Sequence, residues 1–243
     1  TGGCGEDCAY CAQSSRHVKN PPKAEYLNEE QIIEEARIAK ENGAGRVCIS
    51  ASWRKVPENA EFELILSAGR KIREMGLDVC ATLGTISESQ LIKLKQAGFS
   101  AYNHNVDTGE NYYPEIITTR KYSERLETLL KVQDSGMHCC SGGIIGLGES
   151  DEDRIDMLFA LANREKPLFT IPLNVLVPIP GTPLGNVKPI EFWDLIRVIA
   201  VGRILMPESR ICLAAGRINM TDEQQTLCFM VGVNAVFAGE KLL

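Results

Sequence analysis

Arg46-Val-Cys-Ile-Ser-Ala51 is the stretch from which the fold of this chain is inferred, because it has the pattern of a short buried strand. A helical pattern precedes it, with Asn28 as the expected N-cap and Gly43 as the expected C-cap. Amphipathic helical patterns also separate the strands expected further along the chain, which lie near 78–83, 101–106, 138–145, 169–177, 210–215 and 231–237.

Strands that alternate with helices imply a parallel sheet. The pattern fits an α/β fold of the (β/α)8 TIM-type barrel class, whose first strand would precede Thr1, and a doubly wound open sheet is the alternative. The chain starts without Met and ends abruptly at Lys241-Leu-Leu243. We therefore expect a fragment of a longer protein that lacks its first strand and its C-terminal tail. No linker, low-complexity tract or short repeat is visible, so 1–243 is expected to form a single domain.

The N-terminal stretch Cys4-Gly-Glu-Asp-Cys8-Ala-Tyr-Cys11 carries the most specific chemistry of the chain. Thiolates hold iron–sulfur clusters, and a cubane usually takes four of them. Three neighbouring cysteines would cover three irons and leave the fourth iron open to a ligand. A structural zinc site is the alternative, and His17 is then the nearest fourth ligand. In the barrel, this loop would follow the missing first strand, at the end of the sheet where active sites lie.

Composition excludes several classes of protein. The formal net charge is −6, which does not suggest a nucleic-acid groove. We find neither an apolar run long enough to span a membrane nor a secretory signal. The chain has nine cysteines, an odd number that fits a reducing compartment better than a disulfide framework. The expected location is the cytoplasm, or the mitochondrial matrix in a eukaryote.

Side-chain alternation along the expected strands groups further polar residues. Asn103, Asn105 and Asp107 share one face, which either meets solvent or binds a ligand. His104, on the other face, is interpreted as a packed histidine. Cysteines in three different strands make a second metal site possible, although a single strand cysteine is usually a core residue: Cys48, Cys80 and Cys140. Cys139 has the opposite parity to Cys140, Cys212 has the opposite parity to Arg217, and we interpret Cys139, Cys212 and Cys228 as packing residues.

The cysteine spacing resembles the signature of the radical S-adenosylmethionine (SAM) superfamily. The resemblance implies a 4Fe–4S cluster on Cys4, Cys8 and Cys11, with SAM on the open iron and Tyr10 beside its adenine. Reductive cleavage of SAM would then give a 5′-deoxyadenosyl radical.

Over nearly its whole length the chain resembles the biotin synthase family. The resemblance rests on the order and combination of the cysteine stretch, Tyr102-Asn-His-Asn-Val-Asp-Thr108, Ile116-Ile-Thr-Thr-Arg120, Cys140-Ser-Gly-Gly-Ile-Ile-Gly-Leu-Gly-Glu149, Asn174 with Gly181-Thr-Pro-Leu184, and Ala215-Gly-Arg217. It implies sulfur insertion that converts dethiobiotin to biotin, with the sulfur supplied by a 2Fe–2S cluster. An electron donor such as flavodoxin or ferredoxin, and a homodimer at full length, are implied as well. The alternative is another radical SAM enzyme, such as a cofactor maturase or a methylase.

The same resemblance implies roles for individual residues. The 2Fe–2S ligands would be Cys48, Cys80, Cys140 and, unusually for a protonated side chain, Arg217. The SAM-binding residues would be Ala51, Asn105, Asp107 and Arg125. The dethiobiotin contacts would be Asn103 and Asn174.

Overall fold

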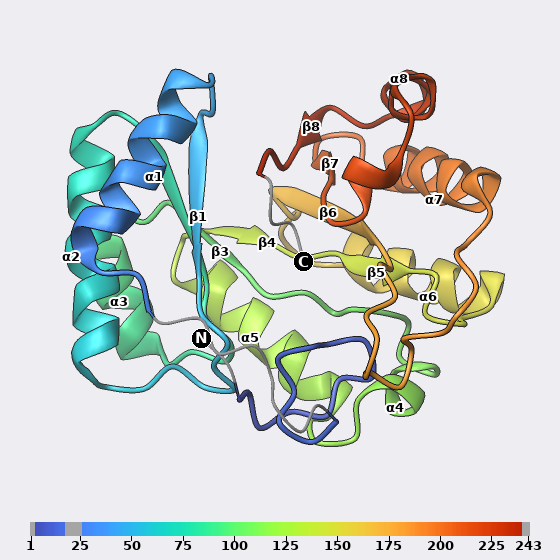
Figure 1. Cartoon of the computed structure of the whole chain (residues 1–243), viewed down its shortest axis with the longest axis horizontal. Helices are drawn as coiled ribbons and strands as arrows, with labels where there is room; N and C mark the ends of the chain where they lie inside the picture. The colour runs from blue at the N-terminus through green and yellow to red at the C-terminus, as the bar shows by residue number, and fades with distance from the viewer. Residues whose placement is uncertain (1–2, 18–25, 240–243) are drawn as a thin grey trace. The chain divides into compact units, whose positions relative to one another are not determined.

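The computed structural model describes residues 3–17 and 26–239, which form two compact units (Figure 1). Unit 1 comprises Thr1–Glu6, Gln13–His104 and Arg125–Cys139, and unit 2 comprises Asp7–Ala12, Asn105–Glu124 and Cys140–Leu243. The two chain ends that suggested a fragment, Thr1 and Lys241–Leu243, lie outside the described residues.

Unit 1 is a layer of helices packed on parallel strands, and in Figure 1 its helices α1, α2 and α3 lie along one side of these strands. The strand order is β1-β2-β3, and the His138 amide at the start of β4 donates to the Ser100 carbonyl next to β3. The elements are α1 (Glu29–Glu41), β1 (Arg46–Ser50), α2 (Ala60–Glu74), β2 (Asp78–Thr82), α3 (Glu88–Gln96), β3 (Ala101–Asn103), most of α5 (Tyr122–Asp134) and the start of β4 (His138–Cys140).

Local sequence explains the boundaries of the first helix. Asn28 caps α1, and Gln31 closes a capping box by reaching back to the Asn28 amide. The helix ends at Glu41 with Asn42 as its C-cap, so the expected end at Gly43 is one residue late. Gly43 follows with a φ of 83°, a conformation that suits glycine.

Unit 2 has parallel strands in the order β4-β6-β7-β8, with β5 also paired to β6. Figure 1 shows α6 and α7 beside these strands. The elements are α4 (Tyr113–Ile116), β5 (Gly143–Ile145), α6 (Asp151–Ala162), β6 (Thr170–Val175), α7 (Phe192–Leu205), β7 (Arg210–Leu213), the 3-10 helix η1 (Arg217–Asn219), α8 (Asp222–Val231) and β8 (Ala235–Val236).

One face of the unit 2 strands carries the core. Ile171 and Leu173 of β6 and Ile211 and Leu213 of β7 are buried. A Cβ added to Gly202 of α7 would lie 3.6 Å from Cδ1 of Ile211, which places Ile211 against this helix. The opposite strand face carries the alternate residues, including Thr170, Pro172 and Asn174 of β6.

Several expected elements are shorter or divided in the structure. The strand expected over 138–145 is two strands, because the amide of Gly142 donates to the side chain of Asn105 instead of continuing a ladder. The strand expected over 231–237 shrinks to Ala235–Val236, since α8 extends to Val231.

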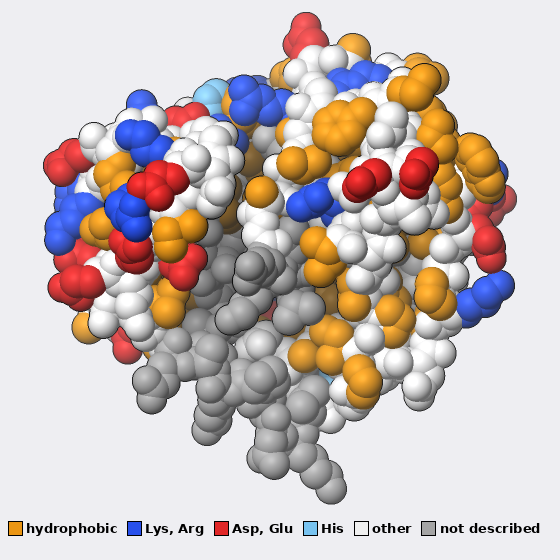
Figure 2. Space-filling model, turned by 45° about the horizontal axis from the view of Figure 1, so that its top comes forward, with side chains coloured by type: hydrophobic (Ala, Val, Ile, Leu, Met, Phe, Trp, Pro, Cys, Tyr) orange, Lys and Arg blue, Asp and Glu red, His pale blue; other side chains and the backbone are white. Residues whose placement is uncertain are grey.

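Apolar side chains remain exposed on the helices of unit 2. They are Ile155 and Phe159 of α6, Trp193, Val201 and Ile204 of α7, and Phe229 and Met230 of α8. Figure 2 shows hydrophobic side chains gathered on the surface of this unit. Within the described residues, no helix is both long and apolar enough to cross a membrane.

Candidate functional site

The second half of the cysteine loop is anchored inside unit 2. The carboxylate of Asp7 accepts hydrogen bonds from both the backbone amides and the hydroxyls of Thr118 and Thr119, with the two amides at 2.9 and 3.1 Å. Partial burial raises the pKa of Asp7, but the bonds from Thr118 and then Thr119 outweigh it and lower the pKa to about 2. Asp7 is therefore a carboxylate that fixes the backbone directly before Cys8.

Two backbone bonds extend this anchor. The Ala9 amide donates to the Ile116 carbonyl at 3.0 Å, and the Leu184 amide donates to the Ala9 carbonyl at 3.1 Å. A tight turn, closed by the Cys11 amide donating to the Cys8 carbonyl at 3.0 Å, brings these two cysteines together along the chain. The backbone around Cys8 and Cys11 is thus fixed by 116–119 and by Leu184.

The first half of the loop is held within unit 1. The Cys4 amide donates to the Gln13 carbonyl at 2.9 Å, and the Ser15 amide donates to the Cys4 carbonyl at 3.0 Å. Glu6 is buried, and its carboxylate accepts from Nε of Arg54 at 2.8 Å. These contacts close the loop on itself around Cys4.

The donor set of the loop fits a cubane cluster with one open iron. Cys4 and Cys11 are partly exposed, Cys8 is buried, and none of the three is part of a disulfide. Across residues 3–17 and 26–239, no three His, Cys, Asp or Glu side chains gather closely enough to hold a single metal ion. A cubane takes each thiolate on a different iron, so its ligands need not converge on a single atom.

Two of the strand cysteines lie side by side in unit 1. Cys48 of β1 and Cys80 of β2 are register partners in adjacent parallel strands, so their side chains share a face. Sγ of Cys48 lies 3.3 Å from the hydroxyl of Thr82. Cys80 is buried. The grouping expected from strand parity holds for this pair.

Cys139 and Cys140 point in opposite directions. Sγ of Cys139 lies 3.8 Å from the Leu129 carbonyl of α5, so Cys139 faces a helix and packs as expected. Cys140, in unit 2, is the register partner of Thr170. It therefore belongs to the strand face of Thr170, Pro172 and Asn174, away from Ile171.

Polar residues converge beside this face in unit 2. Oδ1 of Asn174 accepts from the Ala215 amide at 3.1 Å, and its Nδ2 donates to the Gly143 carbonyl at 3.0 Å. Oδ1 of Asn105 accepts from the Gly142 amide at 3.2 Å. Asp107 is buried and has a φ of 71°, which only a tightly constrained non-glycine residue adopts. These three side chains lie at the carboxyl ends of strands.

The remaining candidate residues take different environments. Asn103, in unit 1, has a buried Oδ1 without a hydrogen-bond partner among the described residues. The Ala51 amide donates to the Thr82 carbonyl and its own carbonyl accepts from Trp53. Arg125 is buried, and Tyr10 is partly exposed. His104 is buried, in agreement with a packed histidine.

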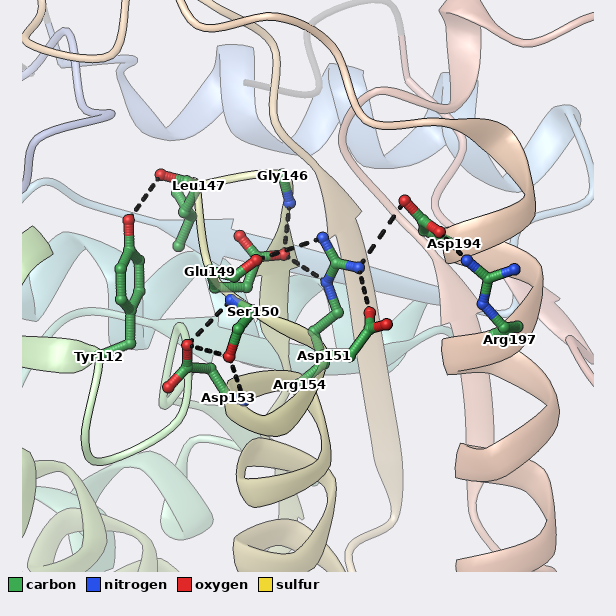
Figure 3. A network of polar contacts seen from close by, with 10 residues as sticks. All are labelled: Tyr112, Gly146, Leu147, Glu149, Ser150, Asp151, Asp153, Arg154, Asp194 and Arg197. Atoms are coloured by element: carbon green, nitrogen blue, oxygen red, sulfur yellow. Dashed lines mark hydrogen bonds and ion pairs between the residues drawn. The ribbon is translucent and has the colours of Figure 1, made fainter.

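A buried ion pair supports the glycine-rich loop after β5, and Figure 3 shows it from close by. Oε1 of Glu149 accepts from the Gly146 amide and from Nε of Arg154, both at 2.8 Å. Arg154 also contacts Asp151 and Asp194, which ties α6 to α7. This network fixes the turn that connects the strand end with α6.

Comparison with known proteins assigns the family. Residues 1–161 match the model of the Radical SAM superfamily, and residues 172–243 match that of the Biotin and Thiamin Synthesis associated domain. The chain is 48% identical over 244 residues to a mitochondrial biotin synthase of Arabidopsis thaliana. It is 51% identical over 246 residues to a biotin synthase of Chlamydia abortus. The chain belongs to the biotin synthase family of the radical SAM superfamily.

All of this chain is covered in both alignments, and it spans 65% of the Arabidopsis protein and 73% of the Chlamydia protein. Membership of the radical SAM superfamily implies a 4Fe–4S cluster and SAM. The expected family is thus confirmed.

Solved structures confirm the fold class. Methylornithine synthase matches 96% of this chain and 67% of its own length with a TM-score of 0.79 at 18% identity. HydG, a maturase of the [FeFe]-hydrogenase, matches 96% of this chain and 54% of its own length with a TM-score of 0.79 at 17% identity. These likenesses show an α/β fold of the partial TIM-barrel type, and the doubly wound alternative is wrong.

Sequence reasoning missed two features of the site. The anchoring role of Asp7 had a local signal, since it directly precedes the second cysteine, but its partners lie more than a hundred residues away. The parity comparison of Cys212 with Arg217 does not hold, because β7 ends at Leu213 and Gly216 has a φ of 83°. The alternation of side chains is broken between the two residues.

Proposed function

We propose that the protein to which this chain belongs converts dethiobiotin to biotin by radical SAM sulfur insertion. The observation that carries this proposal is the 51% identity to a biotin synthase over the whole chain. Maturases of the same fold are far more distant, at 17% identity for HydG. The proposed substrate and activity are those of the family, and individual side chains of this chain are suited to them.

Cys4, Cys8 and Cys11 would hold the 4Fe–4S cluster, which when bound supplies the electron that cleaves SAM. The anchoring of Asp7 to Thr118 and Thr119 supports this role, since preorganised ligands lose little entropy on binding. Thiolate ligation calls for a reducing compartment, and we propose the cytoplasm, or the mitochondrial matrix in a eukaryote. A flavodoxin or ferredoxin would supply the electron.

SAM would be held by Tyr10, Ala51, Asn105, Asp107 and Arg125. A buried carboxylate such as Asp107 suits a ribose diol, which donates two hydrogen bonds. A buried guanidinium such as Arg125 suits a carboxylate, which it can bind in a bidentate manner.

Asn103 and Asn174 would contact dethiobiotin. The buried Oδ1 of Asn103 supports a role as acceptor for a ureido N–H. The side chain of Asn174 donates one N–H to the Gly143 carbonyl, and its oxygen accepts from the Ala215 amide. Its second N–H is left for a ligand. Asn174 would therefore orient the strand ends as well as the substrate.

A 2Fe–2S cluster would supply the sulfur atom. The strand cysteines Cys48, Cys80 and Cys140 are its proposed ligands, and the family resemblance gives Arg217 the fourth position. The shared face of Cys48 and Cys80 supports paired ligation. A homodimer is also proposed on the resemblance.

The test is anaerobic reconstitution with iron and sulfide, followed by SAM, a reductant and dethiobiotin. We expect 5′-deoxyadenosine and biotin to form together. Formation of 5′-deoxyadenosine without biotin would point to a different radical SAM enzyme. If a protein that holds its clusters formed neither 5′-deoxyadenosine nor biotin, the radical mechanism would be contradicted for this chain.

A further inference from the structure

Thr82, the last residue of β2, lies on the same strand face as two of the proposed cluster ligands. Cys48 of β1 and Cys80 of β2 are register partners, and so are Ser50 and Thr82, two residues further along each strand. Residues at i and i+2 of a strand share a face, as do register partners in adjacent strands. All four residues belong to unit 1, so their arrangement is set within that unit.

The opposite face of these two strands is apolar core. Its residues are buried: Ile49 of β1, and Val79 and Ala81 of β2. Thr82 and Cys48 are only half-buried. A threonine suits almost any strand position through its branched side chain, so its presence alone indicates no function. The contact that its hydroxyl makes is the informative feature.

The hydroxyl of Thr82 contacts a thiol. Its Oγ1 lies 3.3 Å from Sγ of Cys48, and within the described residues this sulfur is the only hydrogen-bond partner of the hydroxyl. The backbone of Thr82 is held as well, because its carbonyl accepts from the Ala51 amide at 3.1 Å. The hydroxyl is therefore presented to Cys48 by a fixed strand end.

Metal binding would decide the direction of this hydrogen bond. Between a hydroxyl and a thiol, either group can donate. A thiol that coordinates a metal loses its proton, so the sulfur of Cys48 could then only accept. The Thr82 O–H would be the donor, and a hydrogen bond to a charged acceptor is stronger than one between neutral groups.

Such a bond affects a cluster in two ways. Hydrogen bonds to the sulfurs are among the features that set the reduction potential of an iron–sulfur cluster. A donor withdraws negative charge from the thiolate, which favours the reduced state of the iron and raises the potential. Groups that hydrogen-bond metal ligands also orient them, and their loss typically costs tenfold or more in metal affinity.

We propose that Thr82 is a positioning residue for the second cluster, whose hydroxyl donates to the Cys48 thiolate, holds it in the orientation for ligation and makes the cluster easier to reduce. This inference rests on the proposed function, which supplies the cluster and its ligand Cys48. The proposed ligand set is unchanged, since Thr82 acts through Cys48 and does not touch iron.

The experiment compares the parent protein with Thr82→Val, which removes the hydroxyl at nearly constant volume, and with Thr82→Ser, which keeps it. Thr85→Val is the matched control, because the Thr85 hydroxyl, also in unit 1, donates to the Arg54 carbonyl at 3.1 Å instead of to a thiol. Each protein is reconstituted anaerobically with iron-57 and sulfide.

Two properties of the second cluster are measured before any activity assay. They are its reduction potential, from a mediated titration followed by Mössbauer spectroscopy, and its rate of iron loss to a chelator. The spectrum of the 4Fe–4S cluster reports on correct folding.

We expect Thr82→Val to have a more negative potential at the second cluster and to lose its iron roughly tenfold faster, with the 4Fe–4S cluster unchanged. Thr82→Ser should match the parent in both measurements, since its hydroxyl can still donate. Thr85→Val should also match the parent.

A parent-like potential and parent-like iron loss in Thr82→Val would overturn the proposal. Equal changes in Thr82→Val and Thr82→Ser would overturn it too, because they would assign the effect to packing of the methyl group. If Thr82→Val fails to fold, Thr82→Ala takes its place in the same comparison with Thr82→Ser.

Failure of the proposed function gives a different result. A parent with a single cluster type overturns the proposed sulfur source and this inference together. A parent with two clusters but no biotin contradicts only the proposed function, because the role of Thr82 is read from the potential and from iron loss.

Discussion

Asp7 shows how a single residue far from the strands prepares the cysteine loop. Its carboxylate joins the loop to Thr118 and Thr119, a chain separation of about a hundred residues that no local pattern reveals. Hydrogen bonds to a charged acceptor are stronger than neutral ones. The loop is therefore fixed before any ligand binds.

Replacing Asp7 with Asn should destabilise the protein by about 1–2 kcal/mol, because an amide cannot accept all of these bonds. Urea unfolding of the apo protein checks the prediction. The folded-state pKa of about 2 lies below the ordinary value near 3.9, so the contribution of Asp7 is present above about pH 4 and is lost as the pH falls toward 2. The Asp7→Asn variant should lack this part of the acid dependence, and an unchanged acid profile would contradict the assignment.

Replacing Cys4, Cys8 or Cys11 with Ala should abolish SAM cleavage, since each thiolate covers one iron of the cubane. The measurement is the yield of 5′-deoxyadenosine under anaerobic, reducing conditions. Cys228→Ala, a buried cysteine on α8, is the control and should keep the parent yield. Product from the triple-alanine variant would rule out the radical mechanism.

At the scale of elements, close approach of backbones shapes the strand ends in unit 2. A Cβ on Gly142 would lie 1.9 Å from the carbonyl oxygen of Pro172, a contact that no side chain tolerates. Glu149 then fixes the following turn through the amide of Gly146. Both contacts fix the backbone at the strand ends from which the polar side chains of the site project.

Gly142→Ala should destabilise the protein by about 1–3 kcal/mol, because the backbones of Gly142 and Pro172 must separate. Gly45→Ala is the matched control, since no atom lies within 4 Å of the added methyl group. Thermal and urea unfolding of the two variants check this. Equal stabilities would show that the strands separate without cost.

Glu149→Ala should cost about 2 kcal/mol or more, because it leaves Arg154, whose side chain is 12% exposed, with only its weaker partners. Asp151 contacts the same arginine but is 71% exposed, so Asp151→Asn should cost less than about 0.5 kcal/mol. Urea unfolding distinguishes the two sites. Similar costs for both variants would contradict the buried role of Glu149.

At the scale of the whole molecule, thiolate ligands drawn from distant parts of the sequence couple cluster binding to folding. Anything that binds only the folded state raises its apparent stability. The proposed thiolate ligands of this chain extend from Cys4 to Cys140 in the sequence. Loss of iron is therefore expected to loosen the protein as a whole.

Removal of iron by a chelator should lower the melting temperature by about 4 °C or more, which for a chain of this size corresponds to about 1–2 kcal/mol. Anaerobic calorimetry of the loaded and the iron-free protein measures the shift. The variant with alanine at Cys4, Cys8 and Cys11 should show a smaller shift. An identical melting temperature with and without iron would argue that the ligands contribute nothing to folding.

The sequence by itself determined the alternation of strands and helices, the cap at Asn28 and the cysteine spacing of the Cys4–Cys11 stretch. These depend on local propensity and short spacing, which a linear pattern records. It failed where distant contacts interrupt local order: the strand expected over 138–145 divides, because the Gly142 amide donates to the side chain of Asn105. The tertiary structure alone decided that Asp7 anchors the loop through Thr118 and Thr119. The physical reason is that register and side-chain direction depend on pairing with strands far along the chain, and parity counted through Gly216 loses its meaning where the strand ends.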